Sequence, residues 1–319
     1  MDGYILRSLT FSNFLRKVNK LLQLVSNKFK KSLVFKVIGE YNTPLNGRVI
    51  VATKNGLYLL VDGNIVLISE GEFYGITKYE GLVYVFEKLK NKGRVISFSI
   101  SIIDKDFDVL IEALSPGCHQ IDFLGNELFV TDTYNNRILI YDSKGVMLDE
   151  FYPIGKLENG RKSKNYGHIN SIYSNDGIIY LLCHNETKKT GRKSEVLKVK
   201  RENFQLIDRK TVEASSAHNC VILKNESYLI CDSLNNRVIK DDKSVFNTNK
   251  FTRGLSIAED KILIGGSDYA KRVERKNADG QLYILSFDYK LLETISLPGM
   301  VQEIRLLDTV DFSLSNNNK

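Results

Sequence analysis

The sequence has few prolines and no long hydrophobic run. Four of its 319 residues are proline, against 22 glycines, and 43% are hydrophobic. This composition excludes a disordered chain and favours short strands joined by tight turns. No apolar run approaches the ~20 residues that a membrane-spanning helix needs. We therefore expect a soluble globular protein, with either two domains or one repetitive domain.

Cysteine is also sparse, and a secretory signal is missing. None of the four cysteines forms a CxxC pair, and the first residues lack an uninterrupted apolar stretch. We therefore predict reduced thiols and a cytoplasmic location. Because the chain begins with basic residues and almost no acids, it is also similar to an organelle transit peptide, and that alternative stays open.

Several signatures of enzyme chemistry are absent from the sequence. It contains no P-loop, no GxGxxG loop and no GxSxG elbow. It therefore does not support a nucleotide-binding loop of these types or a Ser-His-Asp triad.

The net charge of +7 belongs to the first part of the chain. Residues 1–39 carry eight basic side chains and one acidic side chain, whereas the remaining 280 residues carry 37 of each sign. A dedicated nucleic-acid binder would carry its positive charge on the folded body. We therefore do not expect nucleic acid as a partner.

Residues 13–31 predict a basic amphipathic helix. Apolar side chains recur there at three- and four-residue spacing, with lysines and arginines between them: Phe14, Val18, Leu21, Leu22, Val25 and Phe29. This is the pattern of a helix with one apolar face. That face can pack on the body of the same chain, or it can contact another protein or an anionic membrane surface.

From residue 47 onward the sequence repeats every 35 to 50 residues or so. Five units begin with similar short segments, at Tyr74, His119, His168, His218 and Arg253. Each unit continues with a turn and a second strand, at 82–86, 127–131, 178–182, 227–231 and 261–264. A third strand follows in each unit. Strands and turns at this period predict an all-β fold, a six-bladed β-propeller.

The two ends of the repetitive region supply the sixth blade. Residues 47–69 contain three strands without an inner one, and 301–307 contain an inner strand without partners. Pairing the two closes the ring and removes exposed sheet edges. We expect a basic N-terminal segment at 1–39, the propeller at 40–310 and a polar, disordered tail at 311–319.

Two units share a polar turn between their second and third strands. The turns run from Asp132 to Arg137 and from Asp232 to Arg237, each with two asparagines. They resemble the NHL repeat, well in these two blades and poorly in the other four. The resemblance implies a structural role, because Asp and Asn bind turn backbone and Arg ties adjacent strands. As Asp132, Asp232 and His184 lie at one level of one face, they are also candidates for substrate binding.

The starts of the inner strands form one ring around one mouth of a propeller channel. This ring would contain Tyr74, His119, His168, His218, Arg253 and either Val301 or Gln302. Neutral imidazole is the commonest ligand of zinc, iron, copper and nickel. We therefore predict a metal site of His119, His168 and His218, holding zinc or iron. The alternative is that these histidines bind water or backbone carbonyls.

The histidine column, joined by Arg and Tyr, resembles the arrangement in peptidylglycine amidating lyase, a zinc enzyme. Gluconolactonase-like propellers also hold a metal at this mouth, through carboxylate and Asn oxygens. The resemblance implies a metal-dependent lyase or hydrolase, and positive charge expected around the mouth favours a small anionic substrate. Arg253 would bind a carboxylate or phosphate, and Tyr74 would donate a proton or hydrogen-bond an oxyanion. The alternative is a propeller scaffold that binds protein or RNA without catalysis.

Three long basic loops are expected around the same mouth, at 158–164, 185–193 and 268–276. Their charge would draw an anionic ligand toward the channel. Solvated lysines are common in loops, so the loops by themselves leave this open.

Overall fold

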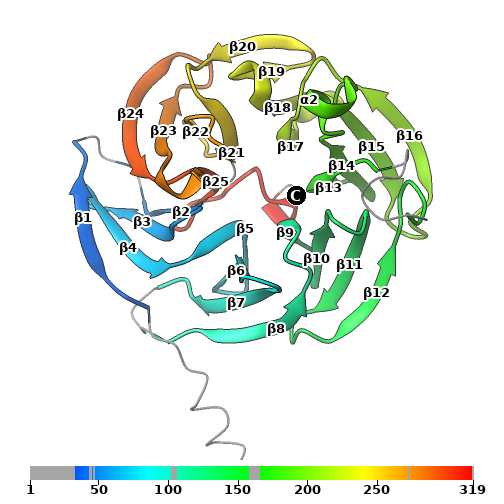
Figure 1. Ribbon diagram of the computed structural model, residues 1–319, viewed down its shortest axis with the longest axis horizontal. Coiled ribbons are helices and arrows are strands. Elements are labelled where there is room, and N and C mark those ends of the chain that lie inside the picture. The colour runs from blue at the N-terminus through cyan, green and yellow to red at the C-terminus, as the bar shows by residue number, and fades with distance from the viewer. Residues whose placement is uncertain are drawn as a thin grey trace, which may run out of the picture.

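Six antiparallel sheets form a closed ring around a central channel (Figure 1). The structure is a computed structural model that describes residues 33–42, 45, 47–101, 106–157, 166–271 and 274–317. The all-β, six-bladed propeller predicted from the repeat is confirmed. The predicted amphipathic helix at 13–31 lies outside the described residues and stays a prediction.

Five blades follow one another along the chain, each with its innermost strand first. Blade 1 contains β5 (Glu72–Tyr79), β6 (Leu82–Lys88), β7 (Gly93–Ser99) and β8 (Asp108–Leu114). Blade 2 contains β9 (Cys118–Leu124), β10 (Glu127–Asp132), β11 (Arg137–Asp142) and β12 (Met147–Phe151). Blade 3 contains β13 (Ile169–Asn175), β14 (Ile178–Cys183), β15 (Glu195–Lys200) and β16 (Leu206–Thr211). Blade 4 contains β17 (His218–Ile222), β18 (Tyr228–Asp232), β19 (Arg237–Lys240) and β20 (Lys243–Asn247). Blade 5 contains β21 (Phe251–Ile257), β22 (Ile262–Ser267), β23 (Asp279–Leu285) and β24 (Leu291–Pro298).

Short helical turns occur between the strands. The one-turn helix α2 (Thr187–Thr190) follows β14. The 3-10 turns are η2 (Lys224–Glu226), η3 (Ser233–Asn235), η4 (Arg275–Asn277) and η5 (Ser315–Asn317).

Blade 6 joins the two ends of the chain, as the sequence predicts. Its strands, from the outside inward, are β1 (Lys36–Glu40), β4 (Asn64–Glu70), β3 (Gly56–Val61), β2 (Val49–Thr53) and β25 (Val301–Leu306). An ion pair of 2.5 Å between Arg48 and Asp308 lies beside the β2–β25 pairing. The predicted boundary at residue 40 is wrong, because β1 begins at Lys36 and adds a fifth strand at the outer edge.

Hydrophobic side chains fill the spaces between neighbouring blades. Ile50 and Phe73 pack together between blades 6 and 1, and Phe86 and Phe123 pack together between blades 1 and 2. Each fully buried side chain of this size stabilises the fold by about 1.5–3 kcal/mol. The inner strand β17 is buried along its whole length, whereas β16 at the rim is exposed along its whole length.

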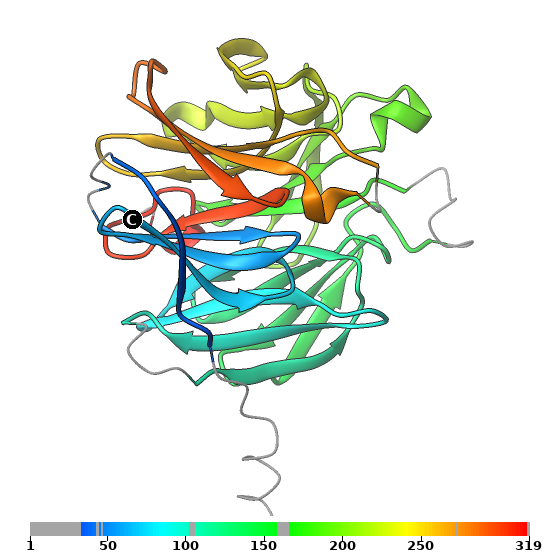
Figure 2. The same ribbon diagram turned by 60° about the vertical axis from the view of Figure 1, so that its left-hand side comes forward.

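The C-terminal segment covers one end of the channel, and the predicted disordered tail at 311–319 is therefore wrong for residues 311–317. The Asp311 side chain is fully buried and accepts hydrogen bonds from Ser256 Oγ (2.6 Å) and Ser313 N (3.0 Å). Farther along, Ser315 donates to the buried Asp122 through its backbone N and its Oγ. Figure 2 shows the C-terminus and the green one-turn helix α2 on opposite faces of the ring. The other end of the channel is thus the one beneath α2.

No helix in the described part of the chain is both long and apolar enough to cross a bilayer. The four cysteines are free thiols and buried. Burial raises the pKa of each of these thiols, so they stay protonated and unreactive at neutral pH. The cytoplasmic location stays a prediction.

Candidate functional site

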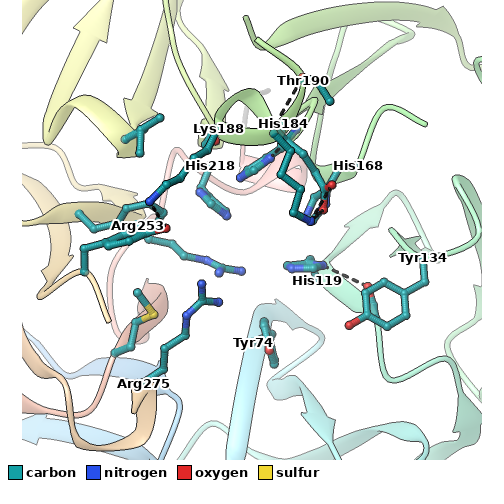
Figure 3. Close-up of a pocket in the computed structure, with 18 of the residues that line it drawn as sticks. Tyr74, His119, Tyr134, His168, His184, Lys188, Thr190, His218, Arg253 and Arg275 are labelled. Atoms are coloured by element: carbon teal, nitrogen blue, oxygen red, sulfur yellow. Dashed lines mark hydrogen bonds and ion pairs between the residues drawn. The ribbon is translucent and has the colours of Figure 1, made fainter. Parts of the chain in front are cut away.

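A cavity of about 1000 Å3 opens at the mouth of the channel where the inner strands begin (Figure 3). Five of the predicted ring residues line it: Tyr74, His119, His168, His218 and Arg253. The sixth position differs from the prediction. Met300 lines the cavity there, whereas the Gln302 amide donates to the backbone carbonyls of Met300 and Val301.

The four histidines form an arc along one side of the cavity. The ring centres of His119 and His168 are 5.3 Å apart. The His184 ring stacks on His168 at 4.5 Å and meets the His218 ring edge-on at 5.1 Å. His184 therefore lies between two of the three residues that the sequence predicts as metal ligands. The sequence placed it at the same mouth, as a substrate-binding candidate.

Hydroxyl groups determine which nitrogen of His119 and His218 carries the proton. His119 Nδ1 is 2.8 Å from Thr133 Oγ1, and that hydroxyl donates its own proton to the Ile169 carbonyl. His218 Nδ1 is likewise 2.8 Å from Ser233 Oγ, which donates to the Thr252 carbonyl at 2.6 Å. Because each hydroxyl has one proton to give, Nδ1 must be the donor in both rings. Nε2 of His119 and of His218 therefore carries a lone pair, and no hydrogen bond from the described residues reaches it.

His184 has the opposite tautomer. Its Nδ1 accepts a hydrogen bond of 2.9 Å from the backbone N of Glu186, so the neutral ring carries its proton on Nε2. His168 Nδ1 lies 3.2 Å from the Tyr166 hydroxyl and 3.7 Å from a Glu186 carboxylate oxygen. The arc thus contains hydrogen-bond acceptors at His119 and His218 and a donor at His184.

All four imidazoles are neutral at pH 7. Burial lowers the pKa of His119, His184 and His218 well below the usual range, and the positive charge of Arg253 lowers each of them further. Burial also lowers the pKa of His168, although Glu186 partly opposes the shift. The histidines therefore add hydrogen-bonding groups to the cavity without adding positive charge.

Arg253 is a buried cation that forms no ion pair with the residues the structure describes. Its side chain is 8% exposed, and no carboxylate of the described residues forms an ion pair with it. The guanidinium lies 5.4 Å from the centre of the Tyr74 ring. Burial lowers its pKa to about 10, so it still carries its charge at neutral pH. Figure 3 shows it directed toward the middle of the cavity.

Tyr74 belongs to a charged cluster that sequence reasoning missed. Lys54 Nζ contacts the Tyr74 hydroxyl, and it lies 3.3 Å from Glu72, which also binds Lys88 at 3.0 Å. Burial opposes the ionisation of Tyr74, but Lys54, Lys88 and Arg253 outweigh it and lower the pKa of the phenol. Tyr74 is therefore a group that can exchange a proton with a bound molecule.

A signal for Lys54 is present in the sequence. Lys54 directly follows the end of β2, and Thr133, His184 and Ser233 directly follow the equivalent second strands of blades 2, 3 and 4. All four side chains contact or belong to the cavity wall. This second column, one residue beyond the Asp132 and Asp232 level, would have identified Lys54.

Asp132 and Asp232 do not line the cavity, so their predicted role in substrate binding is wrong. Both side chains are fully buried in their own turns. Asp132 binds Arg137 at 2.9 Å, and Asp232 binds Arg237 at 2.7 Å. Their carboxylates tie the second strand to the third, which is the structural role that the repeat implies. The next residue in each turn, Thr133 or Ser233, contacts a histidine of the cavity wall.

The histidines have suitable donor atoms for a metal, but they are not grouped around one point. Two imidazoles on one tetrahedral zinc hold their ring centres roughly 5 Å apart, given Zn–N distances of about 2.0–2.1 Å. The pair His119 and His168 meets this spacing, whereas His184 separates His168 from His218. Across the described ranges, no three His, Cys, Asp or Glu side chains are grouped in a way that could hold a metal.

Two of the three predicted basic loops lie at the mouth. Lys188 on α2 donates to the Tyr269 hydroxyl at 3.2 Å, which connects the loop after β14 to the loop after β22. Arg275 on η4 directs its guanidinium into the cavity near Arg253 (Figure 3). The third loop, at 158–164, lies outside the described residues. Arg275 and Lys188 came from loops that the sequence singled out only as regions of positive charge.

Comparison with known proteins supports the fold. No protein-family model and no curated protein matches the chain. Among solved structures, a gluconolactonase-like protein is similar with a TM-score of 0.54 and 10% identity, over 85% of this chain and 89% of that chain. TolB from Acinetobacter baumannii is similar with a TM-score of 0.49 and 12% identity, over 84% and 67% of the two chains. At these identities the likeness shows the fold alone, which the chain shares with the gluconolactonase-like protein: a β-propeller.

Proposed function

We propose that the protein is an enzyme of the lyase or hydrolase class that binds a small anionic substrate at the mouth of the propeller channel. The observation that carries the proposal is the buried guanidinium of Arg253, which faces the cavity without an ion-pair partner in the described parts of the chain. An uncompensated buried charge costs several kcal/mol. A bound carboxylate or phosphate would supply the missing charge and match the planar guanidinium with two hydrogen bonds.

The groups around this position support proton transfer to or from the bound substrate. The Nε2 atoms of His119 and His218 can accept hydrogen bonds, and Nε2 of His184 can donate one. Tyr74, with its lowered pKa and its contact to Lys54, can take up or release a proton. An anion-binding group beside proton donors and acceptors is the arrangement that elimination or hydrolysis of a small anionic molecule requires.

A metal-dependent form of this reaction is the second candidate. It is favoured by the free Nε2 lone pairs of His119 and His218, which their hydroxyl partners hold in the ligating tautomer. His119, His168 and His218 would hold a zinc or iron ion, and the ion would polarise a substrate oxygen. The present grouping of the rings would have to change, because His184 lies between His168 and His218.

Calorimetric titration with small carboxylates and inorganic phosphate tests the anion site. We expect wild-type protein to bind these probes and Arg253→Met to bind them at least ~10-fold more weakly, as expected when a charge-assisted bidentate contact is lost. Lys243→Met is the matched control, because it removes one positive charge from the exposed strand β20. Equal binding by wild type and Arg253→Met would contradict the proposal and favour a propeller scaffold without a channel ligand.

Two further measurements address the reaction and the metal. Turnover of a panel of small carboxylates and phosphate esters, followed by NMR, should be found in wild type and reduced at least ~10-fold in Tyr74→Phe, as loss of a proton-transfer group requires. Elemental analysis of tag-free protein, purified without chelator, decides the second candidate. A stoichiometric metal that a triple His119/His168/His218 to Ala variant loses would support it, and metal-free active protein would exclude it.

A further inference from the structure

Three cations that face the cavity have no carboxylate partner within the described ranges of the chain. Among the residues that the structure describes, Arg253, Arg275 and Lys188 form no ion pair. The other cations of the wall are paired differently: Lys54 with Glu72, Lys189 with Glu186 and Arg192 with Glu195. Because the four histidines are neutral, the unpaired positive charge of the cavity exceeds what a single carboxylate would neutralise.

Two of the three cations meet at the axis. Arg253 and Arg275 direct their guanidinium groups into the same part of the cavity (Figure 3). The Arg275 Nε donates to the Ala270 carbonyl at 3.2 Å, and the outer nitrogens of its guanidinium form no hydrogen bond with the described residues, so a ligand can bind them. Two like charges at one place repel each other, and an anionic group between them relieves the repulsion for both. These two residues form the axial anion position.

The third cation, Lys188, lies against the ring of Tyr269. Lys188 Nζ lies 4.6 Å from the centre of the Tyr269 ring and donates to its hydroxyl. The Tyr269 ring lies 5.8 Å from the Phe251 ring, which in turn lies 5.6 Å from the His218 ring. The Tyr269 and Phe251 rings thus form a continuous line of contacts from Lys188 to His218. Lys188 and the Tyr269 hydroxyl form the rim anion position.

We propose that the substrate carries two anionic groups joined by a short apolar or aromatic linker. This inference rests on the proposed function and names the substrate class of the same site. The axial anion position binds one group, and the rim anion position binds the other. The linker packs on Phe251 and Tyr269, which line the same cavity. A monoanion would leave Lys188 without a counter-charge, and a compact dianion would occupy the axial position alone.

The test is a calorimetric comparison of linear dicarboxylates of increasing length with monocarboxylates of the same length, at constant pH and ionic strength. We expect one dicarboxylate to bind wild type at least ~10-fold more tightly than its monocarboxylate, as a second charge-assisted hydrogen bond predicts. In Lys188→Met this ratio should fall to about 1, with the monocarboxylate affinity unchanged. Tyr269→Phe, which removes only the rim hydroxyl, should lower the ratio by a smaller factor.

Controls separate this inference from the proposed function. Lys188 is exposed, so Lys188→Met should unfold at the wild-type temperature, and Lys243→Met should keep the full ratio. Equal affinity of wild type for dicarboxylates and monocarboxylates would overturn the inference and leave the anion site intact. A ratio that also falls in Lys243→Met would overturn it, because general charge would then be the cause. If no carboxylate binds and Arg253→Met behaves as wild type, the proposed function is wrong, and the inference with it.

Discussion

The two ends of the propeller channel use charged side chains in opposite ways. At the end covered by the C-terminal segment, Asp311 and Asp122 are buried among hydrogen-bond donors, and Arg305 binds Glu303 at 2.8 Å. At the open mouth, Arg253 is also buried but, within the described chain, faces no carboxylate at ion-pair distance.

Under the proposed function, this difference distinguishes charges that stabilise the fold from a charge that binds a ligand. Buried charges that only stabilise a fold are paired and hydrogen-bonded, because an unpaired one costs several kcal/mol. If closing the ring were the only requirement, buried charges at both ends of the channel could be paired. The mouth instead keeps a cation that forms no ion pair with any described carboxylate, beside neutral histidines, as expected if the proposed anion binds there.

The largest effect is expected at the covered end. Asp311→Ala removes an acceptor of hydrogen bonds from Ser256, Ser313 and the backbone N of Leu306, and it leaves these buried donors unsatisfied. We expect the free energy of unfolding to fall by about 3 kcal/mol or more in urea denaturation. Asp260→Ala, on an exposed turn, should change it by less than about 0.5 kcal/mol. Equal effects of the two variants would show that the C-terminal segment is not a structural part of the channel.

An intermediate effect is expected from the hydroxyl that holds His218. Ser233→Ala removes the acceptor of the Nδ1 proton and should cost about 1–2 kcal/mol of folding stability. It should also release the tautomer, so that 15N NMR of the imidazole shows the proton distributed over Nδ1 and Nε2. Ser233→Thr keeps the hydroxyl and is the control for the tautomer. An unchanged Nδ1–H signal in Ser233→Ala would contradict the assigned role of the hydroxyl.

At the mouth, removing a buried charge should raise the free energy of unfolding instead of lowering it. Arg253→Met replaces an unpaired buried cation with an apolar side chain, so we expect the ligand-free protein to gain about 1 kcal/mol of stability. Urea denaturation measures this gain directly. A loss of stability as large as that of Asp311→Ala would mean that Arg253 is a structural charge, and the contrast between the two ends would disappear.

The smallest effect is a difference in pH response. The four histidines titrate near their ordinary pKa of about 6.5 when unfolded and at lower pH when folded. The unfolded state therefore binds more protons, and stability should decline as pH falls below about 6.5. His218→Gln should make this decline shallower. If His218→Gln leaves the decline unchanged, the groups that cause the decline lie outside the mouth.

The pairing that closes the ring should respond to pH in a different range. Arg48 lowers the pKa of Asp308, so the ring closure should weaken only below about pH 4.

Part of the candidate site could be predicted from the sequence because the blades of a propeller are repeats of one structural unit. One period corresponds to one blade, so equal positions in successive units must lie at equal heights around one axis. That rule placed Tyr74, the three column histidines and Arg253 around one cavity, and it paired β2 with β25. The same rule, applied one residue past each second strand, would have added Lys54 and the hydroxyl partners of His119 and His218.

The chain by itself thus determined the number of blades, the closure of the ring and five of the six members of the inner ring, since all three follow from periodicity along the backbone. Only the tertiary structure decided that Asp311 is buried, that His184 lies between His168 and His218, and that Arg253 has no counter-charge in the described residues. These depend on which side chains from distant blades meet. Whether two charges form an ion pair depends on the distance between them in space, and the sequence does not give this distance directly.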